Sequence, residues 1–368
     1  MSNFTVPYTD LAEEFASDKS NYLAAFEKVL LSGKYILGPE LSLFEDEFAR
    51  YCQSDYGIGV ANGTDALLLV LRALDLHSTD EVITAPNSYI ASASAIALAG
   101  ATPKFADICH CGNLSPESFE AAITPRTKAV IPVHLTGRPA EMNAIIKIAR
   151  RHDIFIIEDA AQAVGATLDG KRVGSWGDAA CFSFHPLKNL RAFGDGGMIV
   201  TSHKWLNDKL RQERNQGLAT REKCDYWGFN SRLDELQAAF LRVQLQKLDS
   251  QTEKRRNLAL RYNDLLRPYV EVPDENLGER CVYQTYVIKA KCRDELKLHL
   301  INSGIEALIH YPVPIHLQPA AKYLGYSASD FPRTMKHVSE ILSLPIYPNM
   351  TISQQDYVIN EIKKFYKE

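Results

Sequence analysis

At the centre of the chain lies the stretch DAACFSFHPLKNLRAFGDGGMIVT, residues 178–201. It predicts strands at 179–184 and 198–201, because each is a short apolar run. Pro186 ends the first strand, and the glycines of 194–197 allow a tight turn. The turn carries one amine, Lys188. Between buried strands its pKa would fall and the neutral amine would be a nucleophile; an exposed lysine in a glycine-rich loop is the alternative.

Strand and helix patterns alternate before this stretch. Apolar runs predict strands at 58–60, 81–85, 103–106, 129–133 and 154–157, with helices between them at 65–74, 88–98, 116–123 and 140–151. This alternation predicts a doubly wound α/β domain with a largely parallel sheet. The connection before 198–201 is too short for a helical crossover, so we expect that strand to be antiparallel.

The rest of the chain predicts a second, smaller domain. Residues 230–265 have the apolar stripe of one long helix, and another helical pattern precedes residue 31, with Leu23, Phe26, Val29 and Leu30 on one face. After the long helix we expect strands at 282–288 and 306–309 and helices at 293–303, 334–341 and 353–366. The predicted division is a large domain, 1–245, and a small domain, 246–368.

Two further motifs carry chemistry. Glu158 and Asp159 end a buried strand, at the edge where open α/β sheets bind ligands. Asn62-Gly63-Thr64 joins a strand to a helix, and the N–H groups of a helix start suit a phosphate. An amine, a carboxylate and an anion cradle are the fixed contacts that pyridoxal phosphate needs. For Asp159 the alternative is a helix N-cap.

With these motifs the chain resembles the sugar aminotransferases of the DegT/DnrJ/EryC1/StrS family, which have the aspartate aminotransferase fold. The resemblance covers nearly the whole chain and is carried by SGKYILGPE (32–40), NGTDAL (62–67), PVHLTGRPAEM (132–142), EDAAQA (158–163), SFHPLKNL (183–190), GDGG (194–197), NSRLDELQAA (230–239) and HYPVPIHLQ (310–318). It implies a fold type I transferase: a large α/β domain with a mostly parallel seven-stranded sheet and a smaller α+β C-terminal domain.

The resemblance assigns the cofactor contacts. Lys188 would hold pyridoxal phosphate as a Schiff base and carry a proton, and Asp159 would pair with the pyridine nitrogen. The other implied contacts are Gln162 to the 3-oxygen, Tyr89 on the ring, and Gly63, Thr64, Ser183 and the partner subunit's Asn230 to the phosphate. Burial in a core is the alternative for Tyr89, and an N-cap of the long helix is the alternative for Asn230.

The resemblance also points to a sugar site. His185, His310, Tyr311 and His316 would line it, and Lys223 or Arg221 would meet a diphosphate; the histidines beside prolines have a structural loop role as the alternative. The chain departs from the common family pattern at Thr136, Leu187, Arg191 and Gln284. These departures concern the identity of the substrate rather than use of the cofactor.

The expected activity is transfer of an amino group from an amino acid, L-glutamate, to a nucleotide-linked keto-sugar. The resemblance favours C3 of a dTDP-3-keto-6-deoxyhexose; C4 of a dTDP-, UDP- or GDP-linked 4-keto-6-deoxyhexose is the alternative, because the SFHP stretch resembles the 4-keto enzymes. Relatives with histidine in place of the lysine are dehydratases, so Lys188 favours transamination. A non-catalytic regulatory protein of the same fold would be expected to lose the lysine or Asp159.

Composition predicts an ordinary globular enzyme. Of its 368 residues 46% are hydrophobic and 23% charged, and the net charge of -4 offers no general attraction to nucleic acid or membrane. No apolar run has the length of a membrane span, and the start lacks a signal-peptide pattern, so we expect a cytoplasmic protein. The resemblance implies a homodimer with shared active sites. We expect the seven cysteines to be reduced. Cys109 and Cys111 flank His110, but no second ligand pair follows at zinc spacing, so we expect no metal.

Overall fold

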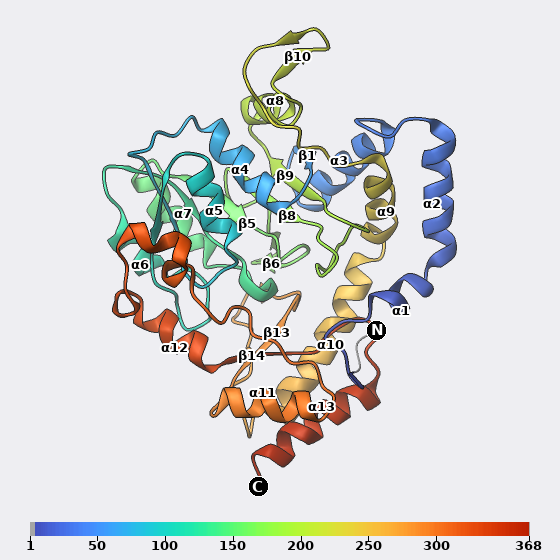
Figure 1. The fold of residues 1–368 in the computed structure, drawn as a ribbon, viewed down its shortest axis with the longest axis vertical. Helices are drawn as coiled ribbons and strands as arrows, with labels where there is room; N and C mark the ends of the chain where they lie inside the picture. Colours follow the sequence, from blue (N-terminus) through green and yellow to red (C-terminus); the bar gives the residue numbers. More distant parts are fainter. Residues whose placement is uncertain (1–3, 368) are drawn as a thin grey trace.

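A seven-stranded sheet forms the centre of the computed structural model, which describes residues 4–367 (Figure 1). Its strand order is β1-β9-β8-β5-β4-β2-β3. The strands are β1 (Tyr56–Val60), β2 (Glu81–Thr84), β3 (Thr102–Phe105), β4 (Thr127–Ile131), β5 (Phe155–Asp159), β8 (Ala179–Ser183) and β9 (Gly197–Thr201). Strand β9 runs antiparallel to both β1 and β8, whereas the other neighbours pair in parallel. The expected mostly parallel sheet, with 198–201 antiparallel, is confirmed.

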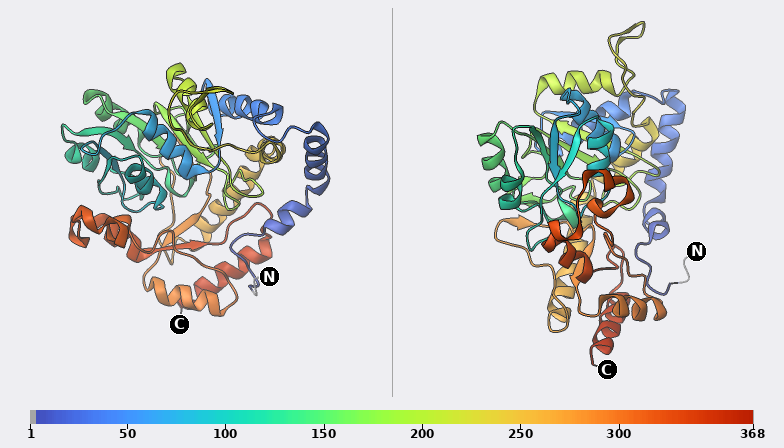
Figure 2. Two further views of the ribbon diagram at one scale, coloured as in Figure 1. Left: turned by 45° about the horizontal axis from the view of Figure 1, so that its top comes forward. Right: turned by 60° about the vertical axis from the view of Figure 1, so that its left-hand side comes forward.

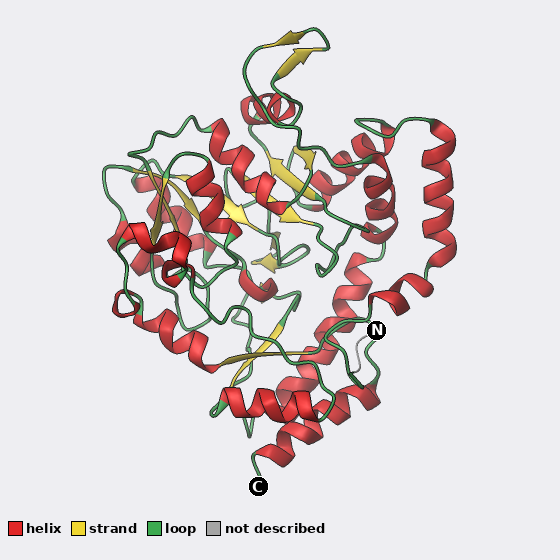
Figure 3. Ribbon diagram, viewed as in Figure 1, coloured by secondary structure: helices red, strands yellow, loops and turns green. Residues whose placement is uncertain are grey.

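Helices cover both faces of this sheet (Figure 3). One face packs against α4 (Gly63–Ala73), α5 (Ala91–Leu98) and α8 (Lys204–Glu213), and the other against α3 (Pro39–Tyr51), α6 (Pro116–Ala122), α7 (Met142–Arg151) and α9 (Glu235–Leu245). Strand β8 shows the two-residue period that this requires: Ala179 and Cys181 join the first core, and Ala180 and Phe182 the second.

A separate hydrophobic core lies towards the C-terminus. It contains residues of α10 (Leu248–Leu266), α11 (Arg293–Asn302), α13 (Ile352–Phe365) and of the antiparallel pair β13 (Tyr286–Lys289) and β14 (Ile341–Leu344). Helix α12 (Pro332–Glu340) leads directly into β14. Val6, from the start of the chain, is buried in the same core and bridges to Ile305. The N-terminal segment therefore contributes to the core built mainly by the C-terminal third.

Three expectations about the C-terminal third are wrong. The helix predicted over 230–265 is two helices, α9 and α10, separated at Gln246 and Lys247. Helix α9 begins after Asp234, so Asn230 is not its N-cap. Strand β14 was not predicted, and the strand expected at 306–309 is reduced to one bridge, between Leu308 and Ser343.

Smaller elements surround the two cores. Helices α1 (Leu11–Ala16) and α2 (Lys19–Ser32) form an outer arm, and β10 (Leu218–Thr220) and β11 (Lys223–Cys224) form a hairpin that projects beyond α8 (Figures 1 and 2). Strands β6 (Thr167–Leu168), β7 (Lys171–Arg172) and β12 (Glu279–Arg280) make a small sheet. On the predicted apolar face of α2, Val29 is buried, but Leu23, Phe26 and Leu30 are 41–49% exposed. Within residues 4–367, no helix combines the length and apolar character needed to cross a membrane.

The redox state of two cysteines differs from the expected one. The Sγ atoms of Cys109 and Cys111 are joined in a disulfide, and the other five cysteines are free thiols. The expectation of seven reduced thiols is therefore wrong for two of them.

Candidate active site

The turn between β8 and β9 positions Lys188. Its backbone N–H donates to the carbonyl of His185 at 2.8 Å, which closes the turn after Pro186. The next residue, Asn189, is buried, and its side-chain amide donates to the carbonyl of Val282 at 3.0 Å. Burial lowers the pKa of the Lys188 ammonium to about 8, and attraction to Asp159 partly opposes this. The turn thus holds an amine that is a far better nucleophile at neutral pH than an ordinary lysine.

Asp159 ends the neighbouring strand, β5. In the sheet register it lies opposite Cys181 of β8, and its side chain is 6% exposed. The hydroxyl of Ser92 donates to Oδ2 at 2.7 Å, and the backbone N–H of Ala161 donates to Oδ1 at 3.2 Å. No helix follows Asp159, so the N-cap alternative is wrong. The carboxylate is fixed in orientation on the same side of the sheet end as Lys188.

The residue before it, Glu158, is a buried carboxylate whose contacts are structural. Its carboxylate lies 3.0 Å from Nε2 of His134, and neither side chain is exposed to solvent. It also accepts hydrogen bonds from the backbone N–H groups of Gly174, Trp176 and Gly177 at 2.8–2.9 Å. Because all of these donors are directed at one carboxylate, Glu158 anchors the segment that leads into β8.

The start of α4 supplies the anion cradle. Asn62 caps the helix by accepting from the N–H of Asp65 at 2.8 Å. The N–H groups of Gly63 and Thr64 lie in the first turn, where a helix has no internal acceptor, and neither has another partner within 4–367. A Cβ on Gly63 would lie 2.7 Å from Cβ of Ser183, so the missing side chain lets the end of β8 meet this helix start. Gly63, Thr64 and Ser183 therefore lie together, as a phosphate site requires.

Gln162 is held between two partners. Its Oε1 accepts from the backbone N–H of Thr136 at 2.7 Å, and its Nε2 donates to the hydroxyl of Tyr311 at 3.3 Å. The ring of Tyr311 lies 5.6 Å from that of Tyr89, which is 53% exposed. Tyr89 is therefore not a core residue in the described chain, and these three predicted residues are brought together.

His310 lies beside the catalytic turn and is neutral at pH 7. Burial, and then the positive charge of Lys188, lower its pKa to about 4. Its Nδ1 lies 2.9 Å from the hydroxyl of Ser343, and its ring lies 5.6 Å from that of Tyr8. The Tyr8 hydroxyl is buried and has no hydrogen-bond partner among the described residues. An unpaired polar group beside His310 suits contact with a ligand.

Four predicted site residues are not gathered around Lys188 in the single chain. Lys223 and Arg221 lie on the projecting hairpin, where Lys223 pairs with Asp225 at 2.7 Å (Figure 2). His316 is 2% exposed and its ring packs 4.7 Å from that of Phe331. Asn230 is exposed.

His185 is also exposed, although it belongs to the catalytic turn itself. Its Nδ1 accepts a hydrogen bond from the backbone N–H of Leu187 at 3.2 Å. The structural loop role considered for this histidine is therefore present in the turn.

Arg191 and Gln284, two of the departures from the family pattern, make specific contacts in the structure. Arg191 is buried and pairs with Glu14 of α1, so it ties the N-terminal arm to the catalytic turn. Burial, and then the charge of Arg255, lower the pKa of Arg191 to about 9. Gln284 donates to the carbonyl of Leu187 at 3.1 Å, and both residues border the same turn.

Sequence reasoning missed Ser92 and Tyr8. Ser92 lies on an alanine-rich helix with Ser88 four residues before it, and the Ser88 hydroxyl donates to that of Ser92 at 3.1 Å. Ser88 precedes the helix and Ser94 lies on it as well, so the sequence did not single out Ser92. Tyr8 had no signal either, because it reaches the site from a non-helical segment far away in the sequence.

These residues fit pyridoxal phosphate. The chain supplies a desolvated amine, Lys188, that feels the charge of a buried carboxylate, Asp159. It also supplies free N–H groups at the start of α4, where the missing side chain of Gly63 leaves room for Ser183. Together with the sheet order, this arrangement defines the class of fold type I transferases that carry a lysine-bound cofactor.

Comparison with known proteins narrows this class. The DegT/DnrJ/EryC1/StrS aminotransferase family matches residues 16–363, and the chain belongs to this family. It is an aminotransferase, and its cofactor is pyridoxal phosphate.

Three relatives illustrate the similarity. A Geobacillus stearothermophilus protein named pleiotropic regulatory protein is 43% identical, over 98% of this chain and 99% of that protein. The Streptomyces venezuelae dTDP-3-amino-3,4,6-trideoxy-alpha-D-glucose transaminase is also 43% identical, over 98% and 96%. The crystal structure of S. venezuelae DesV superimposes with a TM-score of 0.96 at 41% identity, covering 100% of both chains.

Proposed function

We propose that this protein transfers the amino group of L-glutamate to C3 of a dTDP-linked 3-keto-6-deoxyhexose. The observation that carries the proposal is Lys188, an amine whose pKa desolvation lowers to about 8 and which the charge of Asp159 attracts. The position on the sugar is supported by the printed name of the S. venezuelae transaminase, which acts on a dTDP-3-amino sugar and is 43% identical.

In this proposal the chain's own residues bind the cofactor, orient it and move a proton. Gly63, Thr64 and Ser183 bind the phosphate of the cofactor, and Asp159, held by Ser92, orients its ring. When bound, pyridoxal phosphate supplies the electron sink that stores the amino group between the two half-reactions. Lys188 takes a proton at Nζ from the carbon that loses the amino group, and it returns a proton to the sugar carbon. His310 stays neutral near Lys188 and therefore adds no competing positive charge.

We further propose that the protein is a cytoplasmic homodimer with shared active sites. Lys223 on the hairpin, and Asn230, which bridges to Asn215 just before it, would act in the partner subunit, since the hairpin projects away from its own chain (Figure 2). Exposed apolar residues support an interface: Leu23, Phe26 and Leu30 on α2, and Trp227, which is 88% exposed.

The proposed C3 amino transfer has two alternatives. The first is transamination at C4 of a 4-keto-6-deoxyhexose, linked to dTDP, UDP or GDP. The second is a regulatory protein, which the name of the G. stearothermophilus relative favours. Because the amine and the carboxylate are both present and adjacent, enzymatic activity is the stronger proposal.

The deciding experiment combines spectra with product analysis. The purified holoenzyme is mixed with L-glutamate, and loss of the visible cofactor band is followed, with Lys188→Ala as the control. A panel of 3-keto and 4-keto nucleotide sugars is then added, and the amino sugar is identified by mass spectrometry. No spectral change with any amino acid refutes the amino-transfer proposal, whereas amination of only 4-keto sugars refutes the C3 assignment.

Mixing two inactive variants tests the shared site. If Asn230 acts in the partner subunit, Lys188→Ala and Asn230→Ala recombined in one dimer restore one intact site and part of the activity. Absence of recovery, in a mixture shown to exchange subunits, contradicts the shared site.

A further inference from the structure

A second group of reactive side chains lines a cavity of about 370 Å³. The cavity lies between the large domain and the C-terminal third: Cys109, Cys111 and Glu141 come from one side, and Glu271 and His337 from the other. The sequence had shown only the two cysteines around His110. Glu141 joins them from the start of α7, far along the chain.

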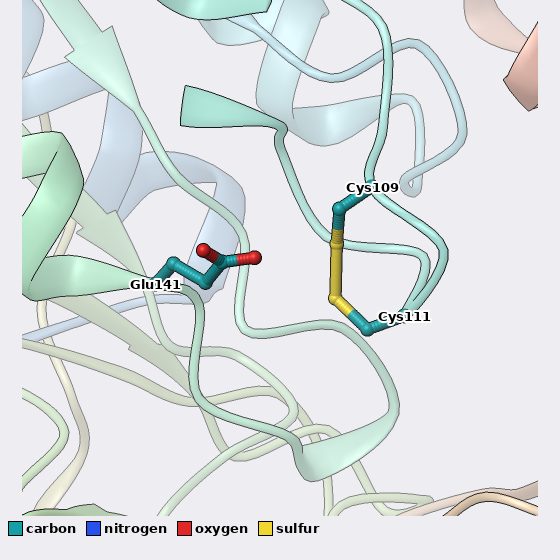
Figure 4. A group of neighbouring side chains, drawn as sticks. All are labelled: Cys109, Cys111 and Glu141. Atoms are coloured by element: carbon teal, nitrogen blue, oxygen red, sulfur yellow. A yellow bond between two sulfur atoms is a disulfide. The ribbon is translucent and has the colours of Figure 1, made fainter. Parts of the chain in front are cut away.

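The residues of this group are of the types that bind metals, and in the structure its two Sγ atoms are bonded to each other in the disulfide. The two Sγ atoms and a carboxylate oxygen of Glu141 all lie within 4.8 Å of one another (Figure 4). Zinc bonds to thiolate at about 2.3 Å and to carboxylate at about 2.1 Å, so tetrahedral ligand atoms lie roughly 3.5 Å apart. The Glu141 carboxylate has no hydrogen bond or ion pair among the residues that the structure describes, so it is free to bind a cation.

Two buried asparagines hold the cysteine turn independently of the disulfide. Asn113 donates to the carbonyls of Arg138 and Pro139 at 3.2 and 3.0 Å, and Asn87 donates to the carbonyl of Gly112 at 2.8 Å. Both asparagines are 2% exposed. Asn113 ties the turn to the segment that leads to Glu141, and Asn87 ties it to the loop after β2. The backbone of the turn is therefore held by bonds that do not depend on the disulfide.

The surroundings favour three protein ligands and an open fourth position. His110 is turned towards Glu271, at 3.0 Å, so its ring is already engaged. Lys289 donates to the carbonyl of His110 at 3.1 Å and pairs with Glu271 at 2.6 Å, so it also helps to hold His110. The ring of His337 lies close to the turn, since a Cβ on Gly112 would be 3.0 Å from its Cε1, but it is not part of the ligand group. The fourth position of a tetrahedral set is therefore left to a ligand from the cavity.

We propose that Cys109, Cys111 and Glu141 bind one thiophilic divalent cation, Zn²⁺, when the cysteines are reduced, and that the disulfide is the metal-free alternative. A thiol reductant supplies two electrons and two protons: the S–S bond breaks, two thiols form, and the reductant is oxidised to its own disulfide. Each thiol then releases its proton as it binds the ion. In a reducing compartment the metal-binding form predominates.

The test measures zinc bound to the tag-free holoenzyme. Reduced wild-type protein is equilibrated with zinc, desalted and analysed for zinc per chain by mass spectrometry. We expect one zinc per chain, and loss of this zinc both in Cys109→Ser/Cys111→Ser and in wild-type protein oxidised beforehand. The matched control is Cys224→Ser/Cys292→Ser, which removes two exposed free thiols elsewhere and retains the zinc.

Two further measurements define the site. Cobalt in place of zinc gives a sulfur-to-metal absorption band that disappears with the two ligand cysteines. Glu141→Gln weakens zinc binding by about tenfold or more in competition with a chelator. Equal zinc in the two double variants, or none in reduced wild-type protein, overturns the proposal. The comparison of reduced with oxidised wild-type protein needs no substitution, so it decides even if a variant fails to fold.

Discussion

The depressed pKa of Lys188 predicts how fast the protein captures its cofactor at each pH. An ordinary lysine has a pKa of 10.5, and in this site it falls to about 8. At pH 7 about one Lys188 in ten is therefore a neutral amine, against about one in 3,000 for an ordinary lysine. The neutral amine is the nucleophile, so Lys188 should capture an aldehyde about 300-fold faster than an unperturbed lysine of equal access.

The assay follows the visible band that forms when apoprotein meets pyridoxal phosphate, from about pH 6 to about pH 10. The same profile is recorded for a free lysine derivative, so that changes due to the cofactor's own ionisations, which are common to both, can be recognised. Below its pKa Lys188 is mostly protonated. The absolute capture rate should therefore rise about tenfold per pH unit and level off near pH 8.

Replacing Asp159 should shift the pKa of Lys188 in a known direction. The charge of Asp159 raises the pKa of Lys188, so Asp159→Asn should lower it further and move the break in the profile to lower pH. Lys188→Ala should form no band. A break near 10.5, or one that Asp159→Asn leaves in place, would refute the argument that burial activates this amine.

Two other predictions concern the supports of the site. Ser92→Ala removes a hydrogen bond to Asp159 worth about 1.5–3 kcal/mol, so cofactor retention, measured by dialysis, should weaken at least about tenfold; Ser94→Ala, on the same helix, should change nothing. Unchanged retention in Ser92→Ala would mean that Asp159 needs no such support. Glu158→Ala strands His134 and three backbone donors, so urea unfolding should show a loss of about 3–5 kcal/mol; the exposed pair of Glu120 should matter by less than about 1 kcal/mol. Equal losses for Glu158 and Glu120 would contradict the anchoring role.

The sequence predicted those features that depend on residues close together in the chain. Pro186 and the glycine cluster determine that β8 and β9 are joined by a tight turn, and a turn this short forces antiparallel pairing. Asp159 and the start of α4 follow from where strands end. Each of these features rests on residues adjacent in the sequence.

The missed features depend on contacts between distant segments. The apolar stripe runs through Gln246 and Lys247 without interruption, so periodicity alone gave no sign of the break between α9 and α10. Strand β14 was missed: the helix predicted at 334–341 reached only its first residue, and its apolar run becomes a strand only by pairing with β13. Neither Ser92 beside Asp159 nor Glu141 beside the cysteines has a neighbour in the sequence that announces its role.

Strand β1 has a consequence for how the protein is made. It lies at the edge of the sheet, and its one strand partner, β9, is synthesised only when the chain has reached residue 201. Until then Ile58 and Val60, both fully buried in the finished protein, have no strand to pair with. Until β9 pairs with it, β1 is therefore an unpaired apolar edge strand in the nascent chain, a kind of edge that is prone to aggregation. Strand β9, which ends the turn that carries Lys188, is also the strand that covers this edge.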